Sequence, residues 1–199
     1  MELHHFEFLI RPVKPKDLPT LNALAQTLFF ANLPKDPSEM EEKVHRSGRS
    51  FKNKNLVGEI PEFFFVLVDN TDTLLGTSLI LSKHGTPDDP HTYFQTERVE
   101  HFSQELHSGV IHETLNLKFE ENGPTEIGGL IIEKILRQHP RKLGKSLSFV
   151  RFNFMKRFPQ YFQTDILAEM MAPVSPTGEN VLWEAVGRNF TNLSYSEAD

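Results

Sequence analysis

The stretch from residue 126 to residue 158 restricts the possible fold more than any other part of the chain. Residues 126–132 (EIGGLII) end in a β-branched run and predict a strand, whose paired glycines, Gly128 and Gly129, permit a bulge or a close approach by another group. After a short polar connection, apolar side chains recur at helical spacing, at Leu147, Val150, Phe154 and Phe158. We therefore expect a strand, a turn and a helix, with the sequence RKLGKS at residues 141–146 where the helix begins.

A helix start of this composition suits a bound anion. The first backbone N–H groups of a helix have no partner within it, and the helix dipole favours negative charge at that end. Gly144 allows a bulky phosphate to come close to the chain, while Arg141, Lys142 and Lys145 add positive charge. The pattern thus predicts a pyrophosphate site, and the alternative interpretation is a solvated basic helix start with a turn glycine.

The overall composition excludes several classes of protein. A chain of 199 residues can bury one sizeable core or two small ones, and its 38% apolar and 24% charged residues are usual for a globular domain. The net charge of −6 argues against nucleic acid as a partner. Because the chain has no cysteine, a disulfide framework, a thiolate zinc site and a cysteine nucleophile are excluded. The sequence contains no signal peptide and no apolar run of membrane length, so we expect a soluble, cytoplasmic protein with no membrane contact.

Apolar periodicity and turn residues predict the order of elements along the chain. Strands are predicted at residues 8–13, 63–68, 74–81, 114–119, 126–132, 164–171 and 190–195. Helices are predicted at residues 18–28, 38–51, from about 141 to 158 and at 176–186, with Asp17 and Ser38 as N-terminal caps and Gly187 as a C-terminal cap. Residues 83–113 form a long polar stretch with five histidines. This order predicts one α/β domain over residues 1–199, with a central mixed sheet and helices on both faces.

The sequence at residues 141–146 resembles the Arg/Gln-x-x-Gly-x-Gly/Ala loop by which GNAT-type N-acyltransferases hold the pyrophosphate of coenzyme A. Ser146 departs from the usual last glycine or alanine but is small enough not to block the loop. The predicted order of elements is also similar to the GNAT arrangement. The resemblance implies a GNAT-like acyl-CoA N-acyltransferase fold.

A narrower resemblance, to the arginine N-succinyltransferases of bacterial arginine catabolism, extends over nearly the whole chain. The matching segments follow one another in the family's order: LIRPV at 9–13 with Asp17, NLP at 32–34, DPHTY at 89–93, HFSQEL at 101–106, RFNF at 151–154, AEM at 168–170, Trp183, residues 187–190 and YSEAD at 195–199. The family implies transfer of a succinyl group from succinyl-coenzyme A to the α-amino group of arginine or ornithine.

The resemblance also suggests which residues bind and what is missing. The coenzyme A contact falls on Leu130, and the candidate cofactor-binding residues are Leu130, Ile132, Arg141, Lys142, Gly144, Lys145 and Ser146. The connection from Ile132 to Arg141 is longer than in the family. Proteins of this family consist of two GNAT-like halves, and this chain corresponds to the N-terminal half. The family's catalytic histidine belongs to the second half, and no residue here corresponds to it.

Acyl transfer also needs a base that removes a proton from the amine. The candidates are His101 and Glu169, with Glu105 and Glu113 as further carboxylates. The histidines of residues 83–113 lack the i, i+4 spacing of a zinc site, so we expect no metal.

Three hypotheses about function remain open. The first is a succinyltransferase acting on arginine or ornithine, and the second is a non-catalytic GNAT-like half that needs a second polypeptide or copy. The third is another GNAT acyltransferase with a different acyl donor. The expected partners are these small molecules and either further copies in a homo-oligomer or a second GNAT-like subunit.

Overall fold

The computed structural model describes residues 7–27, 33–53, 58–170, 174–175 and 177–198. The chain divides into two compact units, Met1–Ala168 and Glu169–Asp199, and each is described by itself. Whether the two act as the single domain expected from the sequence stays a prediction.

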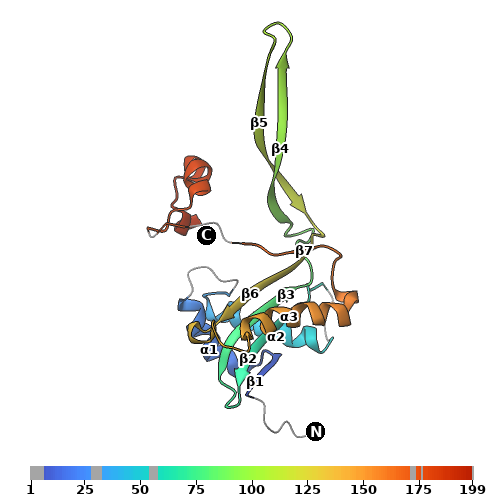
Figure 1. Cartoon of the computed structure of the whole chain (residues 1–199), viewed down its shortest axis with the longest axis vertical. Coiled ribbons are helices and arrows are strands. Elements are labelled where there is room, and N and C mark those ends of the chain that lie inside the picture. The colour runs from blue at the N-terminus through green and yellow to red at the C-terminus, as the bar shows by residue number, and fades with distance from the viewer. Residues whose placement is uncertain (1–6, 28–32, 54–57, 171–173, 176, 199) are drawn as a thin grey trace. The chain divides into compact units, whose positions relative to one another are not determined.

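The first unit contains two sheets, and Figure 1 shows their strands and the helices beside them. Its strands are β1 (Phe8–Pro12), β2 (Glu62–Asp69), β3 (Leu74–Leu81), β4 (His91–Ser103), β5 (Ser108–Glu120), β6 (Thr125–Ile132) and β7 (Ile166–Leu167). Its helices are η1 (Pro15–Asp17), α1 (Leu18–Thr27), α2 (Pro37–Phe51), η2 (Lys134–Leu136), α3 (Leu143–Arg157) and η3 (Pro159–Tyr161). The second unit contains η4 (Trp183–Gly187), α4 (Arg188–Thr191) and α5 (Tyr195–Ala198).

The larger sheet has the strand order β1-β2-β3-β6-β7 and is mixed. The pairs β1–β2, β2–β3 and β3–β6 are antiparallel, whereas β6 and β7 run parallel. The strands expected at residues 8–13, 63–68, 74–81 and 126–132 are confirmed as β1, β2, β3 and β6.

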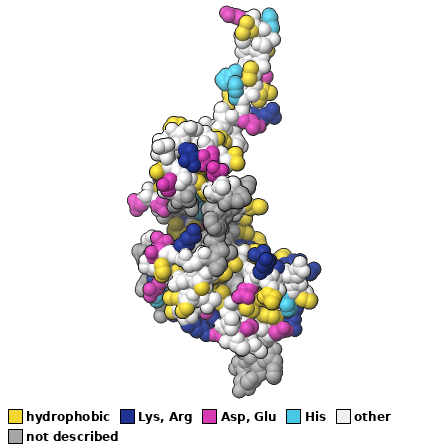
Figure 2. Space-filling model, turned by 90° about the vertical axis from the view of Figure 1, so that its left-hand side faces the viewer, with side chains coloured by type: hydrophobic (Ala, Val, Ile, Leu, Met, Phe, Trp, Pro, Cys, Tyr) yellow, Lys and Arg dark blue, Asp and Glu magenta, His cyan; other side chains and the backbone are white. Residues whose placement is uncertain are grey.

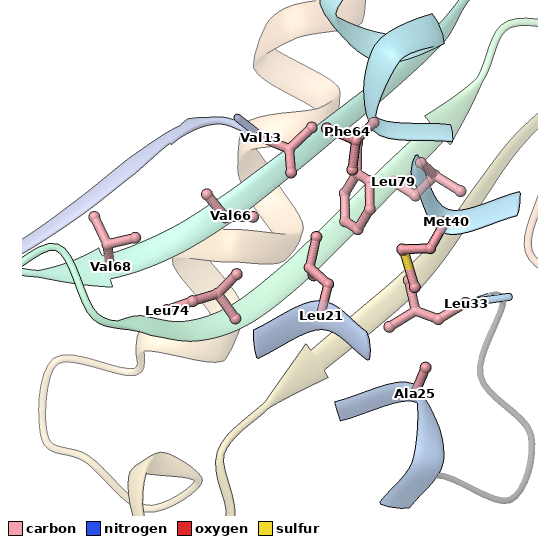
Figure 3. Packing of buried hydrophobic residues seen from close by; sticks show 11 residues of the cluster. Val13, Leu21, Ala25, Leu33, Met40, Phe64, Val66, Val68, Leu74 and Leu79 are labelled. Atoms are coloured by element: carbon pink, nitrogen blue, oxygen red, sulfur yellow. The ribbon is translucent and has the colours of Figure 1, made fainter. Parts of the chain in front are cut away.

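Strand β2 is buried on both sides, because its sequence is an almost uninterrupted apolar run. Phe64, Val66 and Val68 face a cluster that includes residues of α1 and α2, shown in Figure 3. On the other side, Phe63 and Phe65 pack with Met155 of α3, and Leu67 packs with Leu143 and Leu147 of the same helix. The sheet therefore has helices on both faces, as expected from the sequence.

Two predicted caps were wrong in detail. Helix α2 is capped by Asp36, whose side chain accepts from the backbone N–H groups of Ser38 and Glu39, and not by Ser38 itself. Asp17, predicted to cap α1, accepts instead from the Lys14 amide and forms a buried ion pair with Arg11 at 2.8 Å. The predicted end of the first helix, Leu28, lies outside the described residues.

Most of the polar stretch at residues 83–113 is strand, which the sequence did not predict. Strands β4 and β5 pair antiparallel over 13 rungs, from His91↔Glu120 to Ser103↔Ser108, in a two-stranded sheet of their own. The predicted strand at residues 114–119 is only the second half of β5. Charged side chains interrupt the alternation of apolar and polar residues along β4, so the sequence does not show a strand there. The two strands stabilise each other, because each supplies the hydrogen-bond partners of the other.

Predictions for the last 36 residues were mostly wrong. The strand expected at residues 164–171 is paired only at Ile166 and Leu167, and Met171 lies outside the described residues. Gly187 does not end a helix, because the helical stretch continues to Thr191 and is capped by Asn192 at φ 59°. A side chain at position 187 would lie 2.3 Å from the Trp183 ring, which explains the glycine. The strand expected at residues 190–195 is wrong, because its start is in α4 and Tyr195 begins α5.

Among the helices that the structure describes, none combines the length and the apolar character needed to span a membrane.

Candidate functional site

The candidate site is the corner where β6 ends and α3 begins. Opposite Thr77 and Leu79 of β3, strand β6 has one extra residue, so that the register shifts between Gly128 and Ile131. Gly129 adopts φ 54°, and the Thr77 hydroxyl donates to its carbonyl at 2.8 Å. The bulge that the paired glycines permit is therefore present, and it redirects the last residues of the strand.

Strands β6 and β7 pair only at their start. The parallel ladder consists of Thr125↔Ile166 and Glu126↔Leu167, and from there on the described residues offer β6 no strand partner on that edge. Leu130 lies on this part of β6 and is 46% exposed. Backbone groups along an unpaired edge are available to an extended ligand.

Helix α3 begins at Leu143, so the predicted helix after Arg141 is confirmed. Lys142 precedes it in the left-handed conformation, at φ 49°. The amides of Lys145 and Ser146 donate to the Lys142 carbonyl, but those of Leu143 and Gly144 have no acceptor among the described residues. These two N–H groups at the positive end of the helix, which we call the open amides, thus have no partner in the described part of the chain.

The charged side chains predicted for this corner are exposed and differ in their contacts. Arg141 forms an ion pair with Glu7 at 2.8 Å, in which both side chains are more than half exposed. An exposed pair of this kind is worth about 0–1 kcal/mol, so a phosphate could replace Glu7 at little cost. The ammonium group of Lys145 lies 5.4 Å from the centre of the Phe149 ring, and Lys142 and Ser146 are exposed.

Gly144 is not required by the protein's own packing. A Cβ atom at this position would meet only Ile132 side-chain atoms, at 3.8 Å, which is an ordinary contact. Ile132 itself packs with the cluster around Leu147. The structure thus brings Ile132 next to Gly144, and it leaves the outer side of the glycine uncovered.

Arg151, for which the sequence predicted no role, supports the corner from within. It is 4% exposed and lies one turn after Leu147 on the buried side of α3. Its guanidinium donates to the Ser148 carbonyl at 3.1 Å, to the Ser148 hydroxyl at 2.7 Å and to the Gly128 carbonyl at 3.3 Å. Burial lowers the pKa of Arg151. The sequence signal for this role was an arginine on the apolar side of the helix, between Leu147 and Met155.

Polar contacts also surround the short ladder between β6 and β7. The Thr125 hydroxyl donates to the Ser82 carbonyl at 2.7 Å and accepts from the backbone N–H of Gln163 at 2.8 Å. Beside it, a His84 ring nitrogen lies 2.9 Å from a carboxylate oxygen of Glu126. These contacts fix where β7 leaves β6.

The candidate bases lie on other elements. His101 is on β4 opposite Val110, with its ring 5.7 Å from that of His112. Glu105 lies in the turn after β4, and Glu113 lies on β5 opposite Arg98. Glu169 is exposed at the start of the second unit. All four lie outside β6 and α3, and their catalytic roles stay predictions.

Comparison with known proteins gives a consistent result. The family described as "Arginine N-succinyltransferase beta subunit" matches residues 8–199. An arginine N-succinyltransferase of Yersinia enterocolitica is 30% identical over 193 residues, which are 96% of this chain and 55% of that protein. The arginine N-succinyltransferase subunit beta of Pseudomonas aeruginosa is 28% identical over 193 residues, 96% of this chain and 56% of that protein.

A solved structure is also similar. The arginine/ornithine succinyltransferase subunit AI from Pseudomonas aeruginosa superimposes with a TM-score of 0.87 at 28% identity, covering 98% of this chain and 59% of that one. The chain thus spans little more than half the length of the relatives it matches.

Proposed function

The chain belongs to the arginine N-succinyltransferase family, and on this premise we propose that it binds succinyl-coenzyme A and takes part in moving the succinyl group to the α-amino group of arginine or ornithine. The proposal includes the cytoplasmic location expected from the sequence. The observation that carries it is the open corner between β6 and α3, where unpaired amides, exposed lysines and an unpaired strand edge adjoin.

Each part of the corner has a role in this proposal. The open amides of Leu143 and Gly144 donate to the pyrophosphate, and Lys142 and Lys145 add charge around it. The uncovered side of Gly144 leaves room for the phosphate oxygens. The edge of β6 near Leu130 offers hydrogen bonds to the extended arm of the carrier, as an added strand would. Held at both ends, the thioester has a fixed position for attack.

The acyl step requires few further groups. The neutral amine nitrogen attacks the thioester carbonyl, the carbon–sulfur bond breaks, and the thiolate leaves while the amine loses its proton. A backbone N–H beside the bulge at Gly129 is the candidate donor to the carbonyl oxygen, where negative charge develops. The base is the open part of the proposal, with His101 and Glu169 as candidates.

The second hypothesis differs in what this chain does alone. It holds that the chain is a non-catalytic half, which needs a further copy or a second GNAT-like subunit to complete the site. The chain spans 55% and 56% of the length of two relatives. Both hypotheses predict binding of coenzyme A, and they differ in turnover.

Calorimetric titration with coenzyme A, succinyl-coenzyme A and acetyl-coenzyme A tests the proposal. We expect binding of succinyl-coenzyme A at micromolar to submillimolar concentration, followed by thiol release when arginine or ornithine is added. No binding of any of the three at millimolar concentration would refute the proposal. Binding without thiol release supports the incomplete half. Tight binding of acetyl-coenzyme A with indifference to the succinyl form supports another acyl donor.

A further inference from the structure

The hairpin of β4 and β5 has one apolar and one polar face. Residues directly opposite in an antiparallel pair point to the same face, and alternate residues along a strand point to opposite faces. The register of β4 and β5 therefore gathers six large apolar side chains on one side, which we call the apolar face: Phe94, Phe102, Ile111, Leu115, Leu117 and Phe119. The other side carries mostly histidine, glutamate and amide side chains, with Tyr93, Val99 and Val110 among them.

The apolar face is open to solvent. Its six large side chains are between 50% and 64% exposed, and Figure 2 shows hydrophobic side chains along the hairpin. Their exposed area is on the order of 600 Å², at the upper end of what a monomer usually exposes. A two-stranded ribbon is also marginally stable in water unless one face is covered.

We propose that a second copy of this chain covers the apolar face, with the two hairpins packed face to face about a twofold axis along their length. This inference does not depend on the proposed acyl transfer. Two such faces together would bury about 1,200 Å², which reaches the lower end of specific interfaces. The occupant is a second copy because the face is complementary to itself in charge and in shape.

Arg98 and Glu113 make the apolar face complementary to itself in charge. They are directly opposite in the register, in the middle of the apolar face, yet neither forms an ion pair within the described part of the chain. A twofold axis along the hairpin places β4 over the β5 of the other copy. Arg98 then lies across from Glu113 of that copy, and the same pair occurs twice. Each charge then has an opposite charge on the facing copy as well as on its own hairpin, which a purely apolar partner would not provide.

Two further pairs on this face make it complementary to itself in shape. Leu115 is opposite Thr96, and Phe119 is opposite Thr92, so each of these rungs combines a large side chain with a small one. When β4 lies over β5, the large side chain of one copy falls over the small one of the other. Interdigitation of this kind is how two sheet faces pack. Glu100, opposite Ile111, is the one charge that the arrangement leaves without a match.

Sedimentation velocity of the whole chain between about 1 and 200 μM tests the proposal. We expect a concentration-dependent dimer. Leu117→Glu replaces a large side chain of the apolar face with a charge and should raise the dimer dissociation constant at least about 100-fold. The control is Val110→Glu, the same type of change on the same strand at similar exposure but on the other face, which should leave it within about twofold. Glu100→Leu should tighten the dimer.

The outcomes separate clearly. A wild-type chain that stays monomeric at every concentration overturns the proposal and points to another cover, such as the further part of the longer relatives. Equal effects of Leu117→Glu and Val110→Glu also overturn it, as does association without a defined stoichiometry. Circular dichroism checks that each variant keeps its fold, which we expect because the hairpin contributes nothing to the three core clusters among the described residues.

A mixing experiment tests the charge pair between copies. Arg98→Glu leaves only acidic groups at the central rung, and Glu113→Arg leaves only basic ones, so each variant alone should fail to dimerise. An equimolar mixture of the two should form a heterodimer, because every acidic group then faces a basic one. Since the two residues within each chain still repel, recovery can come only from the other copy. A mixture that stays monomeric refutes the twofold arrangement.

Discussion

Glycines at the corner between β6 and α3 illustrate how similar residues serve different purposes. Gly129 is required by the backbone, because its φ is 54° and a Cβ there would lie 3.1 Å from that of Leu79. Gly144 has no such constraint, since a side chain there meets only ordinary contacts with Ile132. A glycine that the fold does not need, beside open amides, is consistent with space kept for a ligand.

Gly144→Val should therefore abolish coenzyme A binding, since the branched side chain fills the proposed phosphate space while leaving the fold intact. Titration calorimetry measures the affinity, and a thermal unfolding midpoint close to that of the wild type shows that the fold persists. The matched control is Gly48→Val in α2, where an added side chain also meets open space. Unchanged affinity in Gly144→Val would count against the phosphate site.

The carboxylate of Asp17 is buried and forms an ion pair with Arg11. Burial raises its pKa, but the bonds to the Arg11 guanidinium and the Lys14 amide, with the charge of Lys16, outweigh burial and leave the pKa below its ordinary value. Its stabilising contribution is thus present above the unfolded-state pKa of about 4 and is lost as the pH falls through the lower folded-state value.

Asp17→Asn should destabilise the fold by about 3 kcal/mol near pH 7, because Arg11 loses one of its two carboxylate partners in a buried site. The loss should shrink as the pH falls below about 4, where the wild type loses the same contribution. Urea unfolding at a series of pH values measures it. Glu42→Gln, which removes an exposed pair with Arg46, serves as the control and should cost about 0.5 kcal/mol or less. A similar loss in both variants would contradict the prediction.

At the scale of elements, the site depends on how β6 departs from a regular strand. The bulge at Gly129 and the short ladder with β7 together leave the strand edge open, and Arg151 of α3 donates to the Gly128 carbonyl next to the bulge. Sequence alone predicted β6 and the helix, and its paired glycines permitted either a bulge or a close approach by another group. It did not predict that β7 would be so short, because the length of a parallel ladder depends on where the neighbouring strand bends.

Gly129→Ala should destabilise the chain by about 1–2 kcal/mol, since alanine is strained at positive φ and its Cβ lies close to Leu79. Gly144→Ala is the comparison, and it should be neutral or stabilise by up to about 1 kcal/mol, because alanine favours helix and fits the space. Chemical denaturation of both variants measures the difference. Equal stability would show that the bulge does not need its glycine.

At the scale of the whole molecule, the core belongs to the first unit. All members of the three core clusters lie between Phe8 and Phe162, and β7 closes the sheet shortly afterwards. The family match extends over both units, from residue 8 to residue 199, and confirms the resemblance recognised in the sequence.

A chain ending at Ala168 should therefore unfold cooperatively, with a thermal midpoint within a few degrees of the full chain, because it keeps every core cluster and β7. Differential scanning calorimetry makes the comparison. Loss of a cooperative transition would show that the first unit needs the residues after Ala168 to fold.

Local pattern was sufficient for much of this protein. Apolar runs and periods predicted most of the strands and helices of the first unit, and their order along the chain predicted a mixed sheet covered on both faces. The same reasoning located the helix start at residues 141–146 and its open amides. Tertiary structure alone decided which distant residues meet: Arg151 with Gly128, Arg11 with Asp17 and Asp72, and β4 with β5. These pairings bring together groups far apart in the chain, or groups whose contact depends on the path of the chain between them, so no local period records them.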